Sequence, residues 1–354
     1  MSKCVVYQKY SEALNDINII NYQFIAYVYS TWHLDNVMAN MLIKGVTKGL
    51  IFVLPLELKR FVKANFDHPV LSNCTIVELR HVDVKCDYFL LKRRIFEKNS
   101  QTIHIFNSMG VDLYLLLSLP LRNNHVDYLI FDEGTGSYFP KFIIKQSRYN
   151  NFLWTYVNIT FKEMVKNIMV WLTDIKITKS LLFVKRKNTY SLNISLTEAL
   201  SKVYSQYTKA ELDIPVIENS VILFKDANLG DVEFYKKIFS LIPKNYQIYV
   251  KLHPMEKREE FSKLAQEFNC LIIPNAISGE YVVNLLKPKY VIGGVSTVVY
   301  TSSAIFGCNV VSLYDLYIKY NYINRYVIYD RLNKCLDRKI EIIDTMEQLA
   351  EVIK

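Results

Sequence analysis

Residues 290–300 read YVIGGVSTVVY: a short apolar run, two glycines, two hydroxyl residues and a second apolar stretch. The run Tyr290–Ile292 predicts a buried strand, and Ser296 or Thr297 suits the N-cap of a helix that follows it. A strand that turns directly into a helix is the repeating unit of parallel α/β sheets. This stretch therefore predicts an α/β fold.

The same alternation extends to both sides of this stretch. In the C-terminal half, further strands are predicted at 221–224, 247–252 and 271–273, and helices at 232–241, 257–268 and 279–286. In the N-terminal half, strands are predicted at 24–28, 51–54, 75–79, 103–106 and 128–131, with a helix over 33–43 that starts near Ser30 and Thr31. Two such series predict two Rossmann-like halves.

The region between the two series differs in composition. From about residue 140 to 207 the chain has long, basic and aromatic helical stretches rich in Lys and Asn. We predict an N-terminal domain over 1–205 with a helical insertion at about 140–205, and a C-terminal domain over 206–340. The helical tail at 341–354 is expected to pack back on the N-terminal domain.

Composition limits the class of protein. With 354 residues, 51% of them hydrophobic and 22% charged, the chain can form two ordinary domains with substantial cores, which excludes a disordered polymer. Six cysteines without a CxxC pair favour reduced thiols in the cytoplasm. The sequence lacks a signal peptide pattern and a long apolar run, so a soluble or peripheral protein is expected.

The net charge favours an anionic partner. Lys and Arg number 43 against 34 Asp and Glu, a formal charge of +9. Nucleic acid, an acidic membrane face and a nucleotide-activated substrate all satisfy this balance. A basic nucleic-acid-binding protein is the least favoured of these, because the sequence has no RNP motif or recognition-helix signature.

An acidic turn follows the predicted strand at 128–131. It reads Asp132-Glu133-Gly134-Thr135-Gly136. The carboxyl end of a strand is where open α/β sheets bind ligands, and glycines let the backbone approach a substrate. One of two adjacent carboxylates in a desolvated place can have a raised pKa and accept a proton from a hydroxyl. An ordinary acidic turn is the alternative interpretation.

His253-Pro254 follows the predicted strand at 247–252. The proline ends regular structure and holds the imidazole at the strand tip, where it can protonate or neutralise a departing phosphate. The same dipeptide occurs at His68-Pro69 without such a context. The pair is therefore informative only together with other motifs.

The hydroxyl pair Ser296-Thr297 follows Gly294 at a predicted helix start. Unpaired amides at such a helix end bind anions, phosphate above all, and a plain capped helix is the alternative. The loop lacks a Walker or dinucleotide fingerprint. Glu280 opens the helix at 279–286 and suits either a ribose diol or the helix dipole.

One further acid, Asp231, opens the helix at 232–241, where capping is the simpler explanation. The sequence has no Asp-x-Asp motif and no histidine cluster, so no metal is expected.

Taken in order, Asp132-Glu133-Gly134, His253-Pro254 and Ser296-Thr297 resemble the three motifs of bacterial sialyltransferases. The turn at 131–136 is similar to that of glycosyltransferase family 52, the lipooligosaccharide and capsular sialyltransferases. The resemblance spans about residues 24–300. It implies a GT-B architecture, with two Rossmann-like domains facing across a cleft. It also implies an inverting, metal-independent transfer from CMP-sialic acid to a galactose-terminated surface glycan, without a cofactor.

The resemblance also implies residue roles. His253 would act on the CMP phosphate, Ser296 and Thr297 would bind it, and Glu280 would contact the ribose. The base stays open between Glu133, which polysialyltransferases of similar pattern would use, and Asp231, which lies twenty-two residues before the histidine as in family 52.

The expected partners follow from this interpretation. They are CMP-sialic acid and a glycan acceptor that can be lipid-linked, with no nucleic acid, and a homo-oligomer is compatible with the sequence. A peripheral contact with the inner face of the cell membrane is expected through the basic aromatic stretch Arg148–Lys187. The alternative function is a GT-B glycosyltransferase that uses another nucleotide-activated sugar.

Overall fold

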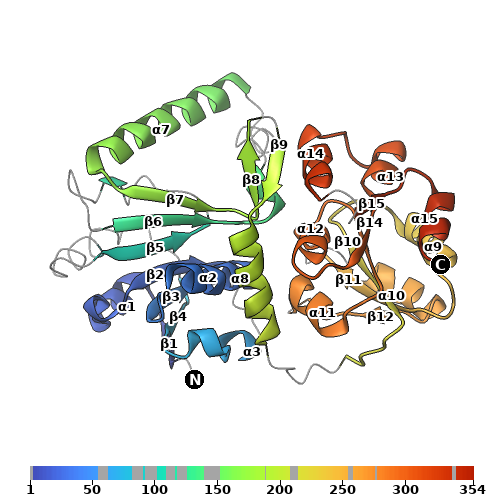
Figure 1. Ribbon diagram of the computed structural model, residues 1–354, viewed down its shortest axis with the longest axis horizontal. Helices are drawn as coiled ribbons and strands as arrows, with labels where there is room; N and C mark the ends of the chain where they lie inside the picture. Colours follow the sequence, from blue (N-terminus) through green and yellow to red (C-terminus); the bar gives the residue numbers. More distant parts are fainter. Residues whose placement is uncertain are drawn as a thin grey trace. The chain divides into compact units, whose positions relative to one another are not determined.

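The computed structural model describes residues 3–54, 63–81, 91, 102–108, 116–117, 126–138, 152–187, 189–207, 214–253, 258–275, 277–336 and 340–354. The chain divides into two compact units. Unit 1 comprises Met1–Leu182 and Ser205–Thr208, and unit 2 comprises Phe183–Tyr204 and Lys209–Lys354. Each unit contains a parallel sheet of its own (Figure 1).

The sheet of unit 1 is parallel throughout and has the order β1-β4-β3-β2-β5-β6-β7. Its strands are β1 (Lys3–Tyr7), β2 (Phe24–Val28), β3 (Gly49–Val53), β4 (Thr75–Leu79), β5 (Ile103–Asn107), β6 (Val126–Phe131) and β7 (Lys176–Ser180). Every residue of β2 and β3 is buried, as expected for central strands covered on both faces. From β4 to β7 the order is that of a Rossmann fold, which reverses direction between β2 and β5.

The helices of unit 1 are α1 (Tyr10–Asp16), α2 (Thr31–Lys44), α3 (Lys63–Phe66) and α7 (Phe152–Thr173), with 3-10 turns at Ile19–Asn21, Pro69–Leu71 and Thr135–Tyr138. Helix α2 begins where the sequence predicts. The Ser30 side chain accepts a hydrogen bond from the amide of His33 at 3.3 Å, and Gly45 ends the helix in the left-handed conformation, with φ of 65°.

The sheet of unit 2 is also parallel throughout and has the order β12-β11-β10-β13-β14-β15. Its strands are β10 (Ser220–Lys225), β11 (Gln247–Leu252), β12 (Leu271–Ile272), β13 (Tyr290–Gly293), β14 (Asn309–Ser312) and β15 (Ile340–Ile342). This is again the Rossmann order, and its direction reverses between β10 and β13. A separate antiparallel hairpin pairs β8 (Phe183–Arg186) with β9 (Thr189–Leu192).

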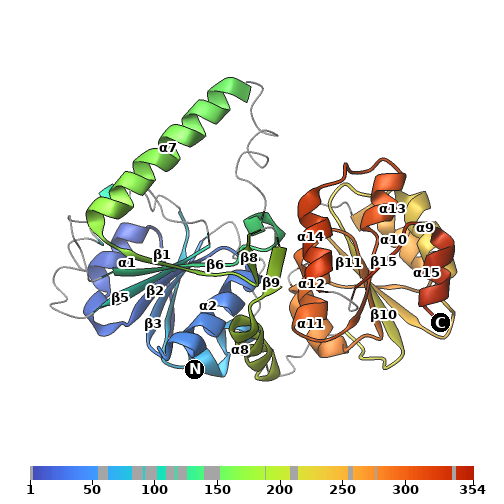
Figure 2. The ribbon, with the colours of Figure 1, turned by 45° about the horizontal axis from the view of Figure 1, so that its top comes forward.

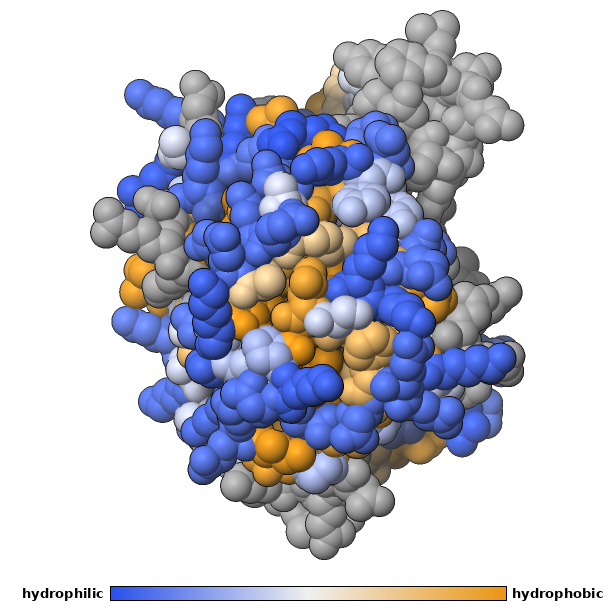
Figure 3. All heavy atoms as spheres, turned by 90° about the vertical axis from the view of Figure 1, so that its right-hand side faces the viewer, coloured by the Kyte–Doolittle hydropathy of each residue, from blue (hydrophilic) through white to orange (hydrophobic). Residues whose placement is uncertain are grey.

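Helices cover both faces of this second sheet. The helices of unit 2 are α8 (Ile194–Ser205), α9 (Val232–Leu241), α10 (Arg258–Glu267), α11 (Gly279–Leu286), α12 (Thr297–Ala304), α13 (Tyr314–Lys319), α14 (Val327–Cys335) and α15 (Met346–Val352). Figure 2 shows α11, α12 and α14 on one face and α9, α10, α13 and α15 on the other. Figure 3 shows the outer side of this unit, where hydrophilic side chains surround a smaller apolar area.

The predicted fold class is confirmed, because both halves of the chain are Rossmann-like α/β units. The predicted helical insertion at about 140–205 is corrected in part. Helix α7 lies there, but β7 pairs in parallel with β6 and completes the first sheet, and β8 and β9 form a hairpin. Residues 139–151 of that region lie outside the described residues.

The C-terminal helix also differs from the expectation. Helix α15 packs on α9 within unit 2, and Leu349 and Ile353 are part of the hydrophobic core of that unit. The Tyr246 hydroxyl donates a hydrogen bond to the carbonyl of Lys354 at 3.1 Å. The physical reason is the short connection from β15, since only three residues separate the strand from the helix.

Among the helices in the described ranges, none has the length and apolar character needed to cross a bilayer.

Candidate active site

In unit 2, two of the sequence motifs and the buried Asp226 meet at one edge of the sheet. Strands β11, β10 and β13 are parallel neighbours, so their carboxyl ends bring together His253, Asp226 and the loop that starts at Gly294. The amide of His253 donates a hydrogen bond to the carbonyl of Lys225 at 3.2 Å, which fixes it at the strand tip. This edge includes the point where the strand order reverses, which is where open α/β sheets bind ligands.

The buried carboxylate of Asp226 organises the loop between β13 and α12. It accepts hydrogen bonds from the amide of Gly294 at 2.9 Å, the amide of Val295 at 3.2 Å and the hydroxyl of Tyr317 at 3.3 Å. Burial raises the pKa of Asp226 to about 6, although these hydrogen bonds oppose the shift. Asp226 was not singled out from the sequence, and only the order of the strands in the sheet reveals its role.

Gly294 is a glycine because of its protein neighbours. A Cβ atom there would lie 2.1 Å from the Tyr317 ring and 2.8 Å from a carboxylate oxygen of Asp226. Since its amide also bonds to Asp226, the packing of the loop itself accounts for this glycine. A contact between Gly294 and a substrate stays a prediction.

Ser296 is the N-cap residue of α12, and its side chain makes no capping hydrogen bond. In α2 and α11 the N-cap serines behave differently, because Ser30 and Ser278 each accept a bond from an amide of the first helical turn. The alternative of a plain capped helix therefore does not describe α12. The Ser296 hydroxyl remains available to an anion at the helix start, beside Thr297, the first helical residue.

Glu280 lies in the first turn of α11 and is buried. Its carboxylate accepts a hydrogen bond from the Thr301 hydroxyl of α12 at 3.2 Å. Burial raises the pKa of Glu280, and the hydrogen bond from Thr301 and the charge of Lys251 oppose the rise. Because Ser278 caps this helix, Glu280 is not needed as a cap, and its predicted contact with a ribose stays a prediction.

Asp231 has the simpler of its two predicted roles in the structure. It is the N-cap of α9, and its exposed side chain accepts a hydrogen bond from the amide of Phe234 at 2.8 Å. The helix start thus accounts for this carboxylate.

In unit 1, Asp132 holds the acidic turn together. Its buried carboxylate accepts hydrogen bonds from the amides of Gly134 at 2.6 Å and Leu182 at 2.9 Å, and from the hydroxyl of Tyr138. Burial raises the pKa of Asp132 against these bonds. Gly134 has φ of 107°, a conformation that favours glycine, so the turn needs this residue.

The neighbouring carboxylate of Glu133 differs from that of Asp132. The residue is exposed, and its backbone amide donates a hydrogen bond to the Ser137 hydroxyl at 2.8 Å. Its carboxylate has no hydrogen-bond partner among the residues that the structure describes. Partial desolvation by nearby protein atoms, reinforced by Asp132, raises the pKa of Glu133, which suits a general base.

The predicted substrate-binding residues Thr135 and Gly136 start the 3-10 turn that follows, and Pro254 lies outside the described residues. His33 is near the same turn, with its ring 5.5 Å from that of Phe131. Burial lowers the pKa of His33 to about 4, and its Nδ1 accepts the amide of Tyr29 at 3.2 Å. These contacts indicate a neutral, structural imidazole.

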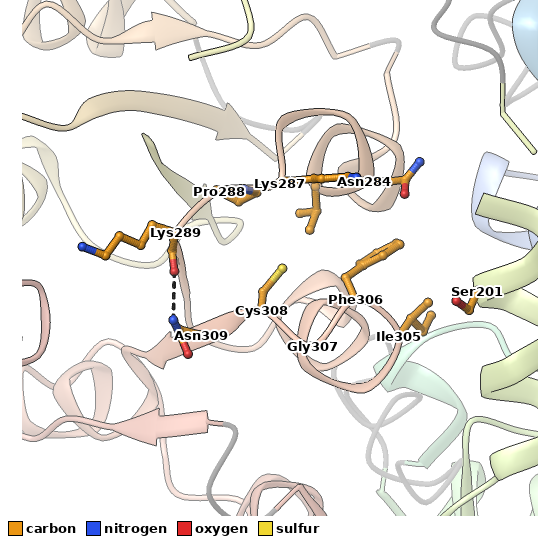
Figure 4. A pocket seen from close by; sticks show the side chains of 11 residues that line it. Ser201, Asn284, Lys287, Pro288, Lys289, Ile305, Phe306, Gly307, Cys308 and Asn309 are labelled. Atoms are coloured by element: carbon orange, nitrogen blue, oxygen red, sulfur yellow. Dashed lines mark hydrogen bonds between the residues drawn. The ribbon is translucent and has the colours of Figure 1, made fainter. Parts of the chain in front are cut away.

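A cavity of about 500 Å³ lies elsewhere in unit 2. It is lined by Asn284, Lys287, Phe306, Cys308 and Asn309, next to the amino ends of β13 and β14, so it lies at the opposite edge of the sheet from His253 (Figure 4). Burial raises the pKa of Cys308 to about 11, which leaves the thiol unreactive. This cavity is separate from the candidate active site.

Within the described ranges, no three His, Cys, Asp or Glu side chains lie together in a way that could hold a metal ion.

Two Rossmann-like units in one chain are the domain composition of the GT-B glycosyltransferases, and this is the fold class of the protein. The carboxyl ends of the strands carry an acid-glycine turn in unit 1, and a histidine and a serine-threonine helix start in unit 2. The profile of the family "Alpha-2,8-polysialyltransferase (POLYST)" matches residues 67–315, and the chain belongs to that family. Membership supports a sialyltransferase, and the match does not single out glycosyltransferase family 52.

Several solved structures are similar to the chain at low identity. The glycosyltransferase of kitacinnamycin has 10% identity and a TM-score of 0.45, covering 93% of this chain and 89% of that one. MurG of Acinetobacter baumannii has 11% identity and a TM-score of 0.40, covering 94% and 89%. The calicheamicin glycosyltransferase CalG4 has 8% identity and a TM-score of 0.38, covering 94% and 91%. A search of curated proteins finds no match.

Proposed function

We propose that the protein transfers sialic acid from CMP-sialic acid to a glycan hydroxyl, with inversion and without a metal ion. The observation that carries the proposal is Ser296, whose hydroxyl is not used for capping at the helix start beside the reversal point of the sheet. The family supports the donor class. Its name favours an acceptor that ends in sialic acid and an α2,8 linkage.

A galactose-terminated acceptor, as in lipooligosaccharide or capsule repeats, is the second acceptor class that we propose to test. The resemblance of the acidic turn to sialyltransferases of surface glycans supports it.

The donor phosphate would be bound by residues of unit 2. The Ser296 hydroxyl, Thr297 and the first turn of α12 supply hydrogen-bond donors and the positive end of the helix dipole. The amides of Gly294 and Val295 already bond to Asp226, so they shape the loop and do not bind the phosphate. His253 at the tip of β11 would then act on the leaving group.

Glu133 is the base that we favour. Asp132 is committed to the turn by three hydrogen bonds, and Asp231 is committed to the start of α9. Glu133 is solvent-accessible and its pKa is raised, which makes its carboxylate a stronger base than an ordinary one.

The reaction is a single displacement. As Glu133 takes the proton of the acceptor hydroxyl, the oxygen attacks the anomeric carbon of sialic acid from the face opposite the phosphate. The bond from that carbon to the phosphate oxygen breaks, and its electron pair leaves with CMP. His253 donates a proton to the leaving phosphate or neutralises its charge. Stabilising a cation-like sugar and an anionic phosphate is the main electrostatic task of the site.

The test incubates purified protein with CMP-sialic acid and fluorescent lactoside or sialyl-lactoside in EDTA. We expect CMP release and an elongated product, whose linkage NMR identifies. The His253→Ala variant should lower turnover by about 10²- to 10⁴-fold. The rate of transfer from CMP-sialic acid is compared with the rates from other nucleotide-activated sugars. Preference for another donor, or loss of transfer in EDTA, would contradict the corresponding part of the proposal.

A further inference from the structure

Helix α7 (Phe152–Thr173) carries a continuous row of exposed apolar side chains. The exposed fractions are 51% for Val157, 59% for Phe161, 50% for Met164, 48% for Ile168 and 78% for Trp171. Their spacing of four, three, four and three residues places all five on one face of the helix. The row is about 21 Å long at 1.5 Å per residue. We name these five residues the α7 stripe.

The last turns of α7 attach the helix to unit 1 through the opposite face. Met169 and Val170 pack against the hydrophobic core of that unit, and Thr173 is buried, with its hydroxyl donating to the carbonyl of Met169 at 2.7 Å. Figures 1 and 2 both show α7 at the periphery of unit 1, beyond β7. The α7 stripe therefore points away from the core that holds the helix.

A contiguous apolar row of this kind requires an explanation, whereas single exposed apolar residues do not. We propose that the α7 stripe docks unit 1 on an anionic lipid surface, with the helix lying in the plane of the interface. Aromatic side chains are the ones favoured at this boundary, and Trp171 is the most exposed apolar residue of the stripe.

The lysines near the α7 stripe support an anionic lipid surface as its binding partner. Lys162 is exposed on the side of α7 away from the stripe, and Lys176 and Lys179 are exposed on β7, the strand that follows. Between residues 152 and 182 the chain has four lysines against two acids. With the stripe in the apolar boundary, these ammonium groups stay in water close to anionic headgroups.

A second copy of the chain is a less favoured binding partner for the α7 stripe than a lipid surface. The spacing also fits a coiled-coil seam, but it covers only two heptads, fewer than a sustained coiled coil needs. Phe161 and Trp171 are also unlike the branched aliphatic residues that define such seams. Dimerisation through α7 is therefore an outcome that the test must detect.

The inference depends on the surface of unit 1 alone, so it can fail or hold independently of the sialyl transfer. The full-length protein is sedimented with vesicles of phosphatidylethanolamine and phosphatidylglycerol at 3:1, and with vesicles of phosphatidylcholine. We expect stronger binding to the anionic vesicles. The double variant Phe161→Glu, Trp171→Glu should bind them at least about tenfold more weakly, because two large apolar groups no longer enter the lipid.

The matched control is the double variant Ile194→Glu, Val327→Glu. Both residues are apolar and similarly exposed, at 58% and 61%, and both belong to unit 2. This control should bind vesicles as the unmodified protein does. Unfolding temperatures of all variants show that the fold is retained.

Tryptophan fluorescence provides the second measurement. Vesicles should shift the emission of the protein to the blue, and Trp171→Phe should remove most of that shift while retaining binding. Light scattering measures the mass of the protein in solution and so detects a dimer formed through α7. Absence of binding to anionic vesicles, equal binding by the stripe variant, or a dimer that only the stripe variant abolishes would each overturn the proposal.

Discussion

At the scale of single residues, the two candidate carboxylates differ in the hydrogen bonds that already hold them. Asp231 caps α9, whereas Glu133 has no hydrogen bond to its carboxylate within the described ranges. We expect Glu133→Gln to lower kcat by about 10²- to 10⁴-fold. Asp231→Ser keeps an N-cap oxygen and removes the carboxylate, so it should retain activity. The reverse pattern in steady-state kinetics would assign the base to Asp231.

Two N-cap serines allow a matched comparison. Ser278 caps α11 through the amide of Tyr281 at 3.2 Å, whereas Ser296 makes no capping bond. Ser278→Ala should therefore lower the free energy of unfolding by about 1 kcal/mol and leave CMP affinity unchanged. Ser296→Ala should leave the free energy of unfolding unchanged and lower the affinity for CMP by about tenfold. Urea unfolding and calorimetric titration with CMP measure the two effects. If Ser296→Ala lowers stability but leaves the affinity for CMP unchanged, Ser296 does not bind the phosphate.

The buried carboxylate of Asp226 predicts a pH dependence of stability. Its pKa is raised from 3.8 to about 6 in the folded protein, so the folded state binds the proton more tightly than the unfolded chain. This contribution to stability is complete below pH 4 and is lost as the pH rises through 6, in total about 3 kcal/mol. The free-energy difference between the unmodified protein and Asp226→Asn should therefore fall by that amount from pH 4 to pH 7. Urea unfolding at the two pH values measures it, and an equal difference at both would contradict the assignment.

At the scale of elements, strands that form an apolar run were mostly predictable, including the edge strand β12, whereas the interior strand β14 and the other edge strands were missed. β2, β4 and β11 match the predicted ranges, because each is a short apolar run. β7 reads KITKS, with two exposed lysines, and β15 has three residues, so neither forms an apolar run. Edge strands are half-solvated and their sequences resemble loops, which explains why β7 and β15 were missed.

The loop between β13 and α12 predicts a difference between two glycines. Gly294→Ala would bring Cβ to 2.1 Å from the Tyr317 ring, whereas Gly307 has no atom within 4 Å of an added Cβ and only its φ of 64° opposes the change. We expect Gly294→Ala to cost about 3 kcal/mol or more and to weaken CMP binding. Gly307→Ala should cost about 1 kcal/mol. Urea unfolding measures both variants. A similar loss of free energy of unfolding in the two would mean that the loop at Gly294 adapts to the added methyl group.

At the scale of the whole molecule, sequence reasoning identified the site's motifs but not their arrangement. The strand ends after residues 131, 252 and 292 were evident from apolar runs. Which strands are neighbours depends on long-range pairing, which a single sequence does not show. Asp226 acquires a role only because β10 lies between β11 and β13, and that order is visible only in the folded sheet.

The same long-range pairing decides where unit 2 begins. Its first segment, Phe183–Tyr204, precedes the boundary at residue 206 that the sequence favours. Tyr204 packs its ring edge-to-face on Phe306 at 5.0 Å, and the Asn284 side chain donates to its carbonyl at 3.0 Å. A fragment that starts at residue 206 therefore lacks a buried part of the unit.

This predicts different behaviour for two fragments. Residues 183–354 should unfold cooperatively and bind CMP. Residues 206–354 should be less stable by about 3 kcal/mol or more, because the buried ring of Tyr204 is absent and leaves Phe306 exposed. Tyr204→Ala within the longer fragment should reproduce much of that loss. Thermal and urea unfolding measure all three, and equal stability of the two fragments would place α8 outside unit 2 and restore the boundary at 206.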